Sequence, residues 1–222
     1  MRAFIFDFNG TLFLDSPLHI QAWDMFCKKY GMPFSEDLFY RYMCGPPNHE
    51  IIRKMMGNEL SDEEVSRISE EKEAMYRQIV LDDPSLQSLT PGADVMLDTL
   101  KARGIPIAIA TGSIRSNVDF YMNTLKIDRW FDYDHIFYSH ADLPGKPDPT
   151  VYRMAMEHLG FSPAETVVVE DGLAGVQSAV GAGVKSVIAI DTTLGSEVFQ
   201  GIPEVRAIIH DFYGFDRLID QL

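Results

Sequence analysis

Apolar and polar residues follow two different periods along this chain. Short, mostly apolar runs at 3–6, 105–110, 135–138, 166–169, 185–190 and 207–209 are typical of strands buried on both faces. Apolar residues at helical spacing fill 93–102, 150–159 and 174–182, and a further helix is expected between residue 113 and about residue 126. Strands that alternate with helices of about ten residues predict an α/β fold, a doubly wound parallel sheet with right-handed crossovers.

The segment from about residue 18 to about residue 80 has a different character. Its apolar residues recur at helical spacing, and it contains no good strand candidate. Gly31, the run 45–47 and Gly57 divide it into helices, and Ser61 with Glu64 has the pattern of a capping box that opens a fourth helix. We therefore expect an α/β domain of residues 1–14 and 90–222 and an inserted helical domain of residues 15–89.

Composition narrows the class of protein. The 222 residues carry a formal net charge of −14, which argues against nucleic acid as a partner because polyanion binding needs clustered Lys and Arg. Cys27 and Cys44 have no metal-ligand spacing, so neither a zinc site nor a disulfide scaffold is expected. No apolar run approaches about 18 residues and a strand-like run begins at residue 2, so we expect no membrane span and no signal peptide. The expectation is a cytoplasmic monomer.

Polar residues stand where three of the predicted strands end. Asp7 follows the first apolar run, Thr111 follows 105–110, and Glu170 and Asp171 follow 166–169, while Lys146 lies in a loop. Parallel strands end at one edge of the sheet, where open α/β sheets bind ligands. Asp7 and Asp171 offer the hard oxygen ligands that Mg²⁺ prefers, and Lys146 offers a positive charge for carboxylates and a bound phosphate. Each residue alone has an ordinary alternative, as a turn residue, a helix cap or a surface lysine.

Thr111 is followed by Gly112 and Ser113 and then by a predicted helix. A hydroxyl and main-chain amides at a helix N-terminus favour anions, so 111–113 is a candidate phosphate-binding segment. Phosphoryl transfer needs a nucleophile, a divalent cation and donors for the phosphate oxygens. The polar residues at the strand ends supply all three types of group.

The run Asp-Phe-Asn-Gly-Thr-Leu at 7–12 closely resembles the first motif of the haloacid dehalogenase superfamily, Asp-x-Asp-Gly-Thr-Leu. The other polar residues match the later motifs of that superfamily in order, and the resemblance covers essentially the whole chain. It implies a Rossmann-like core with an inserted all-α cap domain that closes over the substrate and excludes water.

The resemblance also implies a role for each matching residue. Asp7 is the nucleophile that attacks phosphorus, and Thr111 and Lys146 hold the phosphate, with the amides of Gly112 and Ser113 beside them. The substrate is a small phosphorylated metabolite such as a sugar phosphate.

The metal ligands implied by the resemblance are Asp7, Asp171 and the main-chain carbonyl of Asn9, which bind Mg²⁺. Glu170 is a second acidic group near the metal, directly or through water. The peptide bond between residues 146 and 147 is a candidate for the cis isomer, which is common at the matching position of the family.

The helical insert lies where this superfamily carries its cap, and the arrangement resembles the β-phosphoglucomutase-like branch. His19 resembles the linker histidine of that branch, and Lys72 matches a cap lysine that contacts the substrate. Asn48, in the run 45–48, stands where β-phosphoglucomutases carry an arginine that grips a second phosphate. Its presence favours a monophosphate hydrolase over a mutase. An ordinary linker residue and a solvated helix face are the alternatives for His19 and Lys72.

Asn9 departs from the family pattern, in which an aspartate protonates the leaving oxygen and later activates water. An amide does neither, and general acid–base help is typically worth about 10²–10⁴-fold. The favoured hypothesis is therefore a Mg²⁺-dependent phosphatase with slow turnover. Three explanations stay open: a substrate such as an acyl phosphate whose leaving group needs no proton, His19 as the replacement acid–base group, or a weak or silent relative, including an engineered Asp-to-Asn variant. A phosphometabolite-binding relative without catalysis and a mutase are the alternative functions.

Overall fold

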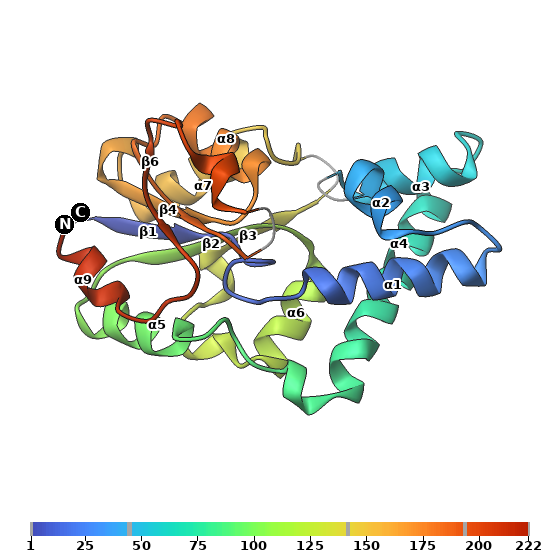
Figure 1. The fold of residues 1–222 in the computed structure, drawn as a ribbon, viewed down its shortest axis with the longest axis horizontal. Helices are drawn as coiled ribbons and strands as arrows, with labels where there is room; N and C mark the ends of the chain where they lie inside the picture. Colours follow the sequence, from blue (N-terminus) through green and yellow to red (C-terminus); the bar gives the residue numbers. More distant parts are fainter. Residues whose placement is uncertain (1, 44–45, 141–142, 193–194, 222) are drawn as a thin grey trace. The chain divides into compact units, whose positions relative to one another are not determined.

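The computed structural model describes residues 2–43, 46–140, 143–192 and 195–221. The chain divides into two compact units (Figure 1). The core unit consists of Met1–Leu14 and Ser88–Leu222, and the helical unit consists of Asp15–Gln87. The chain returns to the core unit at residue 88, two residues before the expected boundary.

A parallel sheet of six strands among the described residues forms the centre of the core unit. The strands are β1 (Ala3–Phe6), β2 (Ile107–Ile114), β3 (Ile136–Ser139), β4 (Thr166–Glu170), β5 (Ser186–Ile190) and β6 (Val205–Ile209). Their order is β3-β2-β1-β4-β5-β6, and every neighbouring pair is parallel. The strand order reverses between β1 and β4, which is the switch point where open sheets of this kind bind ligands. The predicted doubly wound sheet is confirmed.

Helices cover both faces of this sheet, which explains why its central strands read as continuous apolar runs. The longer ones are α5 (Ala93–Ala102), α6 (Arg115–Thr124), α7 (Thr150–Leu159) and α8 (Leu173–Gly181), with the short α9 (Phe215–Ile219) near the C-terminus. Short 3-10 helices are η3 (Ile127–Arg129), η4 (Tyr133–His135), η5 (Pro163–Glu165) and η6 (Ser196–Phe199). Figure 1 shows α7 and α8 on one face and α5, α6 and α9 on the other.

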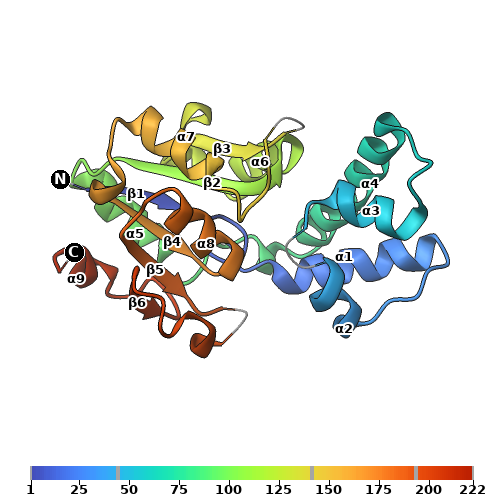
Figure 2. The same cartoon turned by 90° about the horizontal axis from the view of Figure 1, so that it is seen from above.

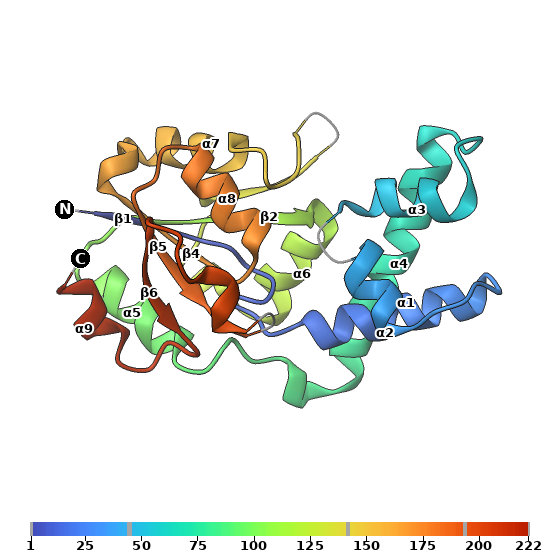
Figure 3. The ribbon, with the colours of Figure 1, turned by 45° about the horizontal axis from the view of Figure 1, so that its top comes forward.

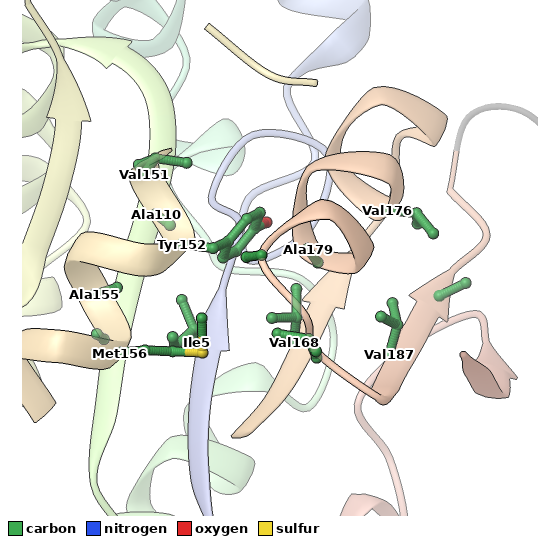
Figure 4. Packing of buried hydrophobic residues seen from close by; sticks show 14 of the residues in the cluster. Ile5, Ala110, Val151, Tyr152, Ala155, Met156, Val168, Val176, Ala179 and Val187 are labelled. Carbon is green, nitrogen blue, oxygen red and sulfur yellow. The ribbon is translucent and has the colours of Figure 1, made fainter. Parts of the chain in front are cut away.

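Side chains from both layers interdigitate on the face covered by α7 and α8. Ile5 of β1 and Val168 of β4 pack with Tyr152 of α7 and Ala179 of α8 in one buried cluster (Figure 4). Because successive strand residues point to opposite faces, Phe4 lies on the other side of the sheet from Ile5. Its ring contacts that of Phe215 of α9, with centroids 5.9 Å apart. This contact fixes α9, a five-residue helix too short to show a periodicity in the sequence.

The helical unit has its own apolar core. Its elements are α1 (Ser16–Lys29), α2 (Glu36–Leu38), the π-helix η1 (Phe39–Met43), α3 (Asn48–Met56), α4 (Asp62–Asp82) and the 3-10 helix η2 (Pro84–Leu86). Figures 2 and 3 show α1 and α4 side by side within this unit. The predicted capping box is confirmed: the Ser61 side chain accepts from the amide of Glu64, whose carboxylate accepts from the Ser61 amide.

Two local expectations were wrong. β2 continues to Ile114, so residues 111–113 lie in a strand rather than in the turn before a helix, because pairing with β3 resumes at Ile114 and Ser139 beyond an irregularity. α1 begins at Ser16, before the start expected near residue 18, since a proline is tolerated in the first helical turn, where the amide has no partner in the helix. α3 begins at Asn48, directly after the run 45–47 that was expected to divide the helices. Cys44 and Gly45, which the sequence analysis discussed, lie outside the described residues.

No helix in the described part of the chain is both long and apolar enough to cross a membrane.

Candidate active site

The first strand places Asp7 at the switch point of the sheet. The Asp7 amide donates to the carbonyl of Val169 in β4 at 2.9 Å, which extends the pairing of Phe6 with Val169 by one residue. Asp7 and the end of β4, where Glu170 and Asp171 lie, are therefore neighbours across the sheet edge. Asp7 is 7% exposed. The predicted convergence of these strand ends is what the structure shows.

Lys146 joins the two strand ends. Its Nζ donates to Asp7 Oδ1 and to Glu170 Oε1, both at 2.6 Å, and to the carbonyl of Ala110 in β2 at 2.9 Å. The Lys146–Pro147 peptide bond is cis, as predicted. One ammonium thus spans three strands, β1, β2 and β4, and serves two buried carboxylates.

Glu170 is held from several sides, which the sequence did not reveal. Besides Lys146, its Oε1 accepts from the hydroxyl of Tyr152 at 2.7 Å, and its Oε2 accepts from the amide of Gly172 at 3.2 Å. A side chain at Gly175 would collide with the Glu170 carboxylate, so a larger residue at that position of α8 would have to displace it. A glycine inside a helix was the one available signal for this packing.

Burial and charge set the ionisation of this cluster. Burial raises the pKa of Asp7 from 3.8 to about 7, the charge of Glu170 adds to the rise, and Lys146 opposes it. Burial alone would lower the pKa of Lys146, but the charges of Asp7 and Glu170 outweigh it and raise that pKa. Burial, with the charge of Glu170, raises the pKa of Tyr152 well above its usual value, so its hydroxyl stays a donor. One cation does not satisfy two buried carboxylates, and Asp7 retains a share of a proton at neutral pH.

The carboxylates fit a magnesium ion. Asp7, Glu170 and Asp171 each offer an oxygen within 4.8 Å of the others. When all three are ionised, their charge exceeds that of Lys146 by two, which one divalent cation neutralises. The donors are all oxygens, as Mg²⁺ prefers. Gly10 leaves room for Asp171, because a side chain at Gly10 would collide with that carboxylate.

Three of the predicted phosphate-binding residues, Thr111, Gly112 and Ser113, lie together in β2. Thr111 and Ser113 are buried, whereas Gly112 between them is exposed. The Thr111 hydroxyl donates to the side-chain oxygen of Asn9 at 3.1 Å, so residues more than a hundred positions apart in sequence share one hydrogen bond. The neighbouring Thr11 donates to Asp171 at 3.3 Å.

The three predicted cap residues form a separate cluster within the helical unit. Lys72, 1% exposed, lies 2.8 Å from His19 Nδ1 and donates to Glu73 Oε1 at 2.9 Å, and Asn48 donates to the same oxygen at 2.6 Å. His19 belongs to α1 and not to a linker, which corrects the expectation for it. Glu73, the carboxylate that Lys72 and Asn48 share, was not among the predicted site residues.

Both ring nitrogens of His19 have partners in this unit. Nδ1 faces the Lys72 ammonium, which has only protons to give, so Nδ1 is the acceptor and the proton of the neutral ring is on Nε2. Nε2 lies 3.4 Å from Asp15 Oδ2, and the ring stacks on Tyr76 at 4.1 Å between centroids. These contacts orient His19 within the helical unit.

The family model described as haloacid dehalogenase-like hydrolase matches residues 1–183. The chain belongs to the haloacid dehalogenase-like hydrolase family. The phosphorylated carbohydrates phosphatase of Thermotoga maritima is 28% identical to this hydrolase over 193 residues, which cover 86% of this chain and 85% of the relative. The β-phosphoglucomutase of Bacillus subtilis is also 28% identical over 193 residues, which cover 84% and 82%. The resemblance to the superfamily and to this branch is confirmed.

A solved structure of another hydrolase has the same fold. The crystal structure of a HAD hydrolase, family IA, variant 3, from Entamoeba histolytica has a TM-score of 0.87 and 34% identity to this hydrolase, and the match covers 99% of this chain and 98% of that one. The fold and the assignment as a hydrolase are therefore shown.

Proposed function

We propose that this hydrolase is a Mg²⁺-dependent phosphatase of a small phosphorylated metabolite such as a sugar phosphate. The observation that carries the proposal is the cluster in which Asp7 lies 2.6 Å from Lys146 beside two further carboxylates with oxygens in ligand range. The similarity to a phosphatase of phosphorylated carbohydrates supports the substrate class.

In this proposal an Asp7 oxygen attacks phosphorus, the new bond gives an aspartyl phosphate, and the bond from phosphorus to the leaving oxygen breaks with its electrons on that oxygen. Water then attacks the aspartyl phosphate and releases phosphate and Asp7. Lys146, whose three protons go to Asp7, Glu170 and the Ala110 carbonyl, offers its charge to the phosphate, and the Thr111 hydroxyl binds a phosphate oxygen by turning its one proton to it from Asn9 Oδ1. Asp7, Asp171 and the carbonyl of Asn9 would hold Mg²⁺, with Glu170 nearby, and the ion supplies positive charge to Asp7 and to the phosphate.

Asn9 limits the rate in this proposal. An amide neither protonates the leaving oxygen nor takes a proton from water, so turnover of an alkyl phosphate falls by about 10²–10⁴-fold relative to an enzyme with a carboxyl group there. His19 is a poor substitute in the arrangement described, because Lys72 and Asp15 engage both of its ring nitrogens. An acyl phosphate, whose leaving group needs no proton, escapes the penalty on the first step but not on the attack of water.

The test compares acetyl phosphate, sugar phosphates and p-nitrophenyl phosphate with and without Mg²⁺. We expect turnover to need Mg²⁺, to favour acetyl phosphate and to vanish in Asp7→Asn, which keeps the size of the side chain. A labelled aspartyl phosphate trapped in the unmutated chain and absent from Asp7→Asn would identify the intermediate. Turnover that is unchanged in Asp7→Asn contradicts the mechanism.

Asn9 also favours a second candidate, a phosphometabolite-binding protein without catalysis. Asn9→Asp separates the two functions. A rise in turnover of about two orders of magnitude indicates a competent site that lacks only its proton donor. Phosphate binding with no turnover in either form indicates the binding protein.

A further inference from the structure

Tyr121 of α6 contacts Phe8 and Asn9, in the segment that follows β1, and it has no role in the proposed phosphatase reaction. Its side chain is 1% exposed, and its ring stacks on Phe8 with centroids 4.1 Å apart and planes at 23°. The stack places the Tyr121 hydroxyl 2.9 Å from the side-chain nitrogen of Asn9 and 3.1 Å from the hydroxyl of Ser113.

Asn9, Tyr121 and Ser113 form a closed ring of hydrogen bonds. The amide of Asn9 donates to the Tyr121 oxygen, and the Ser113 hydroxyl donates to Asn9 Oδ1 at 2.7 Å. The Tyr121 proton then completes the ring by pointing to the Ser113 oxygen. Each group donates once and accepts once within the ring, and hydrogen bonds arranged in this way strengthen one another.

The ring suits an amide better than a carboxylate at position 9. A carboxylate has no proton to give, so the hydroxyls of Tyr121 and Ser113 would both point their protons at it. The contact of 3.1 Å between those two hydroxyls would then contain no hydrogen bond. Asn9 is therefore matched to its neighbours on α6 and β2.

The ring also fixes Thr111. Asn9 Oδ1 accepts from the Thr111 hydroxyl at 3.1 Å in addition to Ser113, and Thr111 Oγ1 accepts from the Ser113 amide at 3.1 Å. Before its proton turns to a phosphate oxygen, the Thr111 hydroxyl is thus held in place by Asn9 and by the Ser113 amide, and the orientation of the Asn9 amide depends on Tyr121.

We propose that Tyr121 is a positioning residue of the phosphate site, which orients the amide of Asn9 and, through it, the hydroxyl of Thr111. The inference rests on the proposed function for the role of Thr111 as a phosphate ligand. Tyr121 itself does not touch phosphate. Its effect must therefore pass through Asn9, and this dependence is what an experiment can measure.

Tyr121→Phe removes the hydroxyl and keeps the ring that stacks on Phe8. The measurement is the dissociation constant of inorganic phosphate, by calorimetry with saturating Mg²⁺, in the unmutated chain, Tyr121→Phe, Asn9→Ala and the double variant. One net hydrogen bond corresponds to about two- to twelvefold in affinity, so we expect weaker phosphate binding of that size in Tyr121→Phe. In the Asn9→Ala background the same change should have an effect of less than about twofold.

Tyr133→Phe is the matched control. The Tyr133 hydroxyl donates to Asp119 of α6, the helix that carries Tyr121, at 2.9 Å, but Tyr133 is exposed and lies outside the ring of hydrogen bonds. It should leave phosphate affinity unchanged. If Tyr121→Phe does not fold, Ser113→Ala breaks the same ring of hydrogen bonds and replaces Tyr121→Phe in the comparison of single and double variants. Equal effects of Tyr121→Phe with and without Asn9, or no effect in the unmutated chain, would overturn the inference.

The side-chain amide resonances of Asn9 in an NMR spectrum separate this inference from the proposed function. We expect Tyr121→Phe to shift them and to speed their exchange with water. Resonances that do not change overturn the inference, whatever happens to phosphate. An unmutated chain that binds no phosphate with Mg²⁺ refutes the proposed function, and the role of Tyr121 at a phosphate site with it, while shifted resonances would still establish the link from Tyr121 to Asn9.

Discussion

Replacing Lys146 with methionine tests the charge balance of the site. The substitution keeps an unbranched chain and removes the ammonium that lies 2.6 Å from both Asp7 and Glu170. Removing one partner of a buried ion pair costs about 3–5 kcal/mol, because the remaining charge is left without compensation. The Lys146 side chain is 14% exposed, so solvent does little to screen the loss. We expect the core unit to lose that amount of unfolding free energy at pH 8 without metal.

The loss depends on pH in a direction that the pKa of Asp7 fixes. Its pKa in the folded chain is raised from 3.8 to about 7, so the stability linked to the neutral form is complete below pH 4 and is lost as pH rises through 7. Without Lys146 the pKa of Asp7 rises further, because the opposing charge is gone. At pH 5 Asp7 is then protonated in the folded variant, and we expect less than half of the loss seen at pH 8.

The assay is urea unfolding followed by Trp130 fluorescence, with Trp23 of the helical unit replaced by Phe in all variants so that only the core unit reports. Arg103→Met is the control: its ion pair with Asp220 is also in the core unit but is exposed, and such pairs contribute about 0–1 kcal/mol. A loss for Lys146→Met below about 1 kcal/mol at pH 8, or equal losses at pH 5 and pH 8, would refute the charge balance described here.

Three further predictions concern the same groups. Gly175→Ala should lower stability by about 1–3 kcal/mol and weaken Mg²⁺ binding in calorimetry, because the new methyl group displaces the Glu170 carboxylate; Gly181→Ala, at the end of the same helix with ordinary contact distances, should do neither. Lys72→Met should destabilise the helical unit by about 3–5 kcal/mol in unfolding followed by Trp23 fluorescence, with Trp130 replaced by Phe, since Glu73 loses its buried cation and keeps only the neutral Asn48 as a partner; a cost below about 1 kcal/mol would contradict that role. Metal-free wild-type protein should lose up to about 4 kcal/mol of stability between pH 4 and pH 8, since each unit of the raised Asp7 pKa corresponds to about 1.4 kcal/mol, and millimolar Mg²⁺ should restore it at pH 8 but not at pH 5.

Local patterns in the sequence were enough to find the strands, most helix ends and the capping box at Ser61. They were enough because the groups involved are close in sequence: an apolar run buries itself in a sheet, and a capping box closes over three residues. The chemistry at strand ends was also predictable, because parallel strands bring their carboxyl ends to one edge. Asp7, Lys146 and Asp171 follow from that rule together with the family motifs.

Contacts between distant segments were not predictable in this way. The hydroxyl that holds Glu170 comes from Tyr152, and the ring around Asn9 is closed by Tyr121, which is 112 positions away in sequence. Either tyrosine reads as an ordinary core residue in its helix. Only the packing of α6 and α7 on opposite faces of the sheet decides which buried hydroxyl meets which polar group, because a single chain does not encode that pairing in any local period.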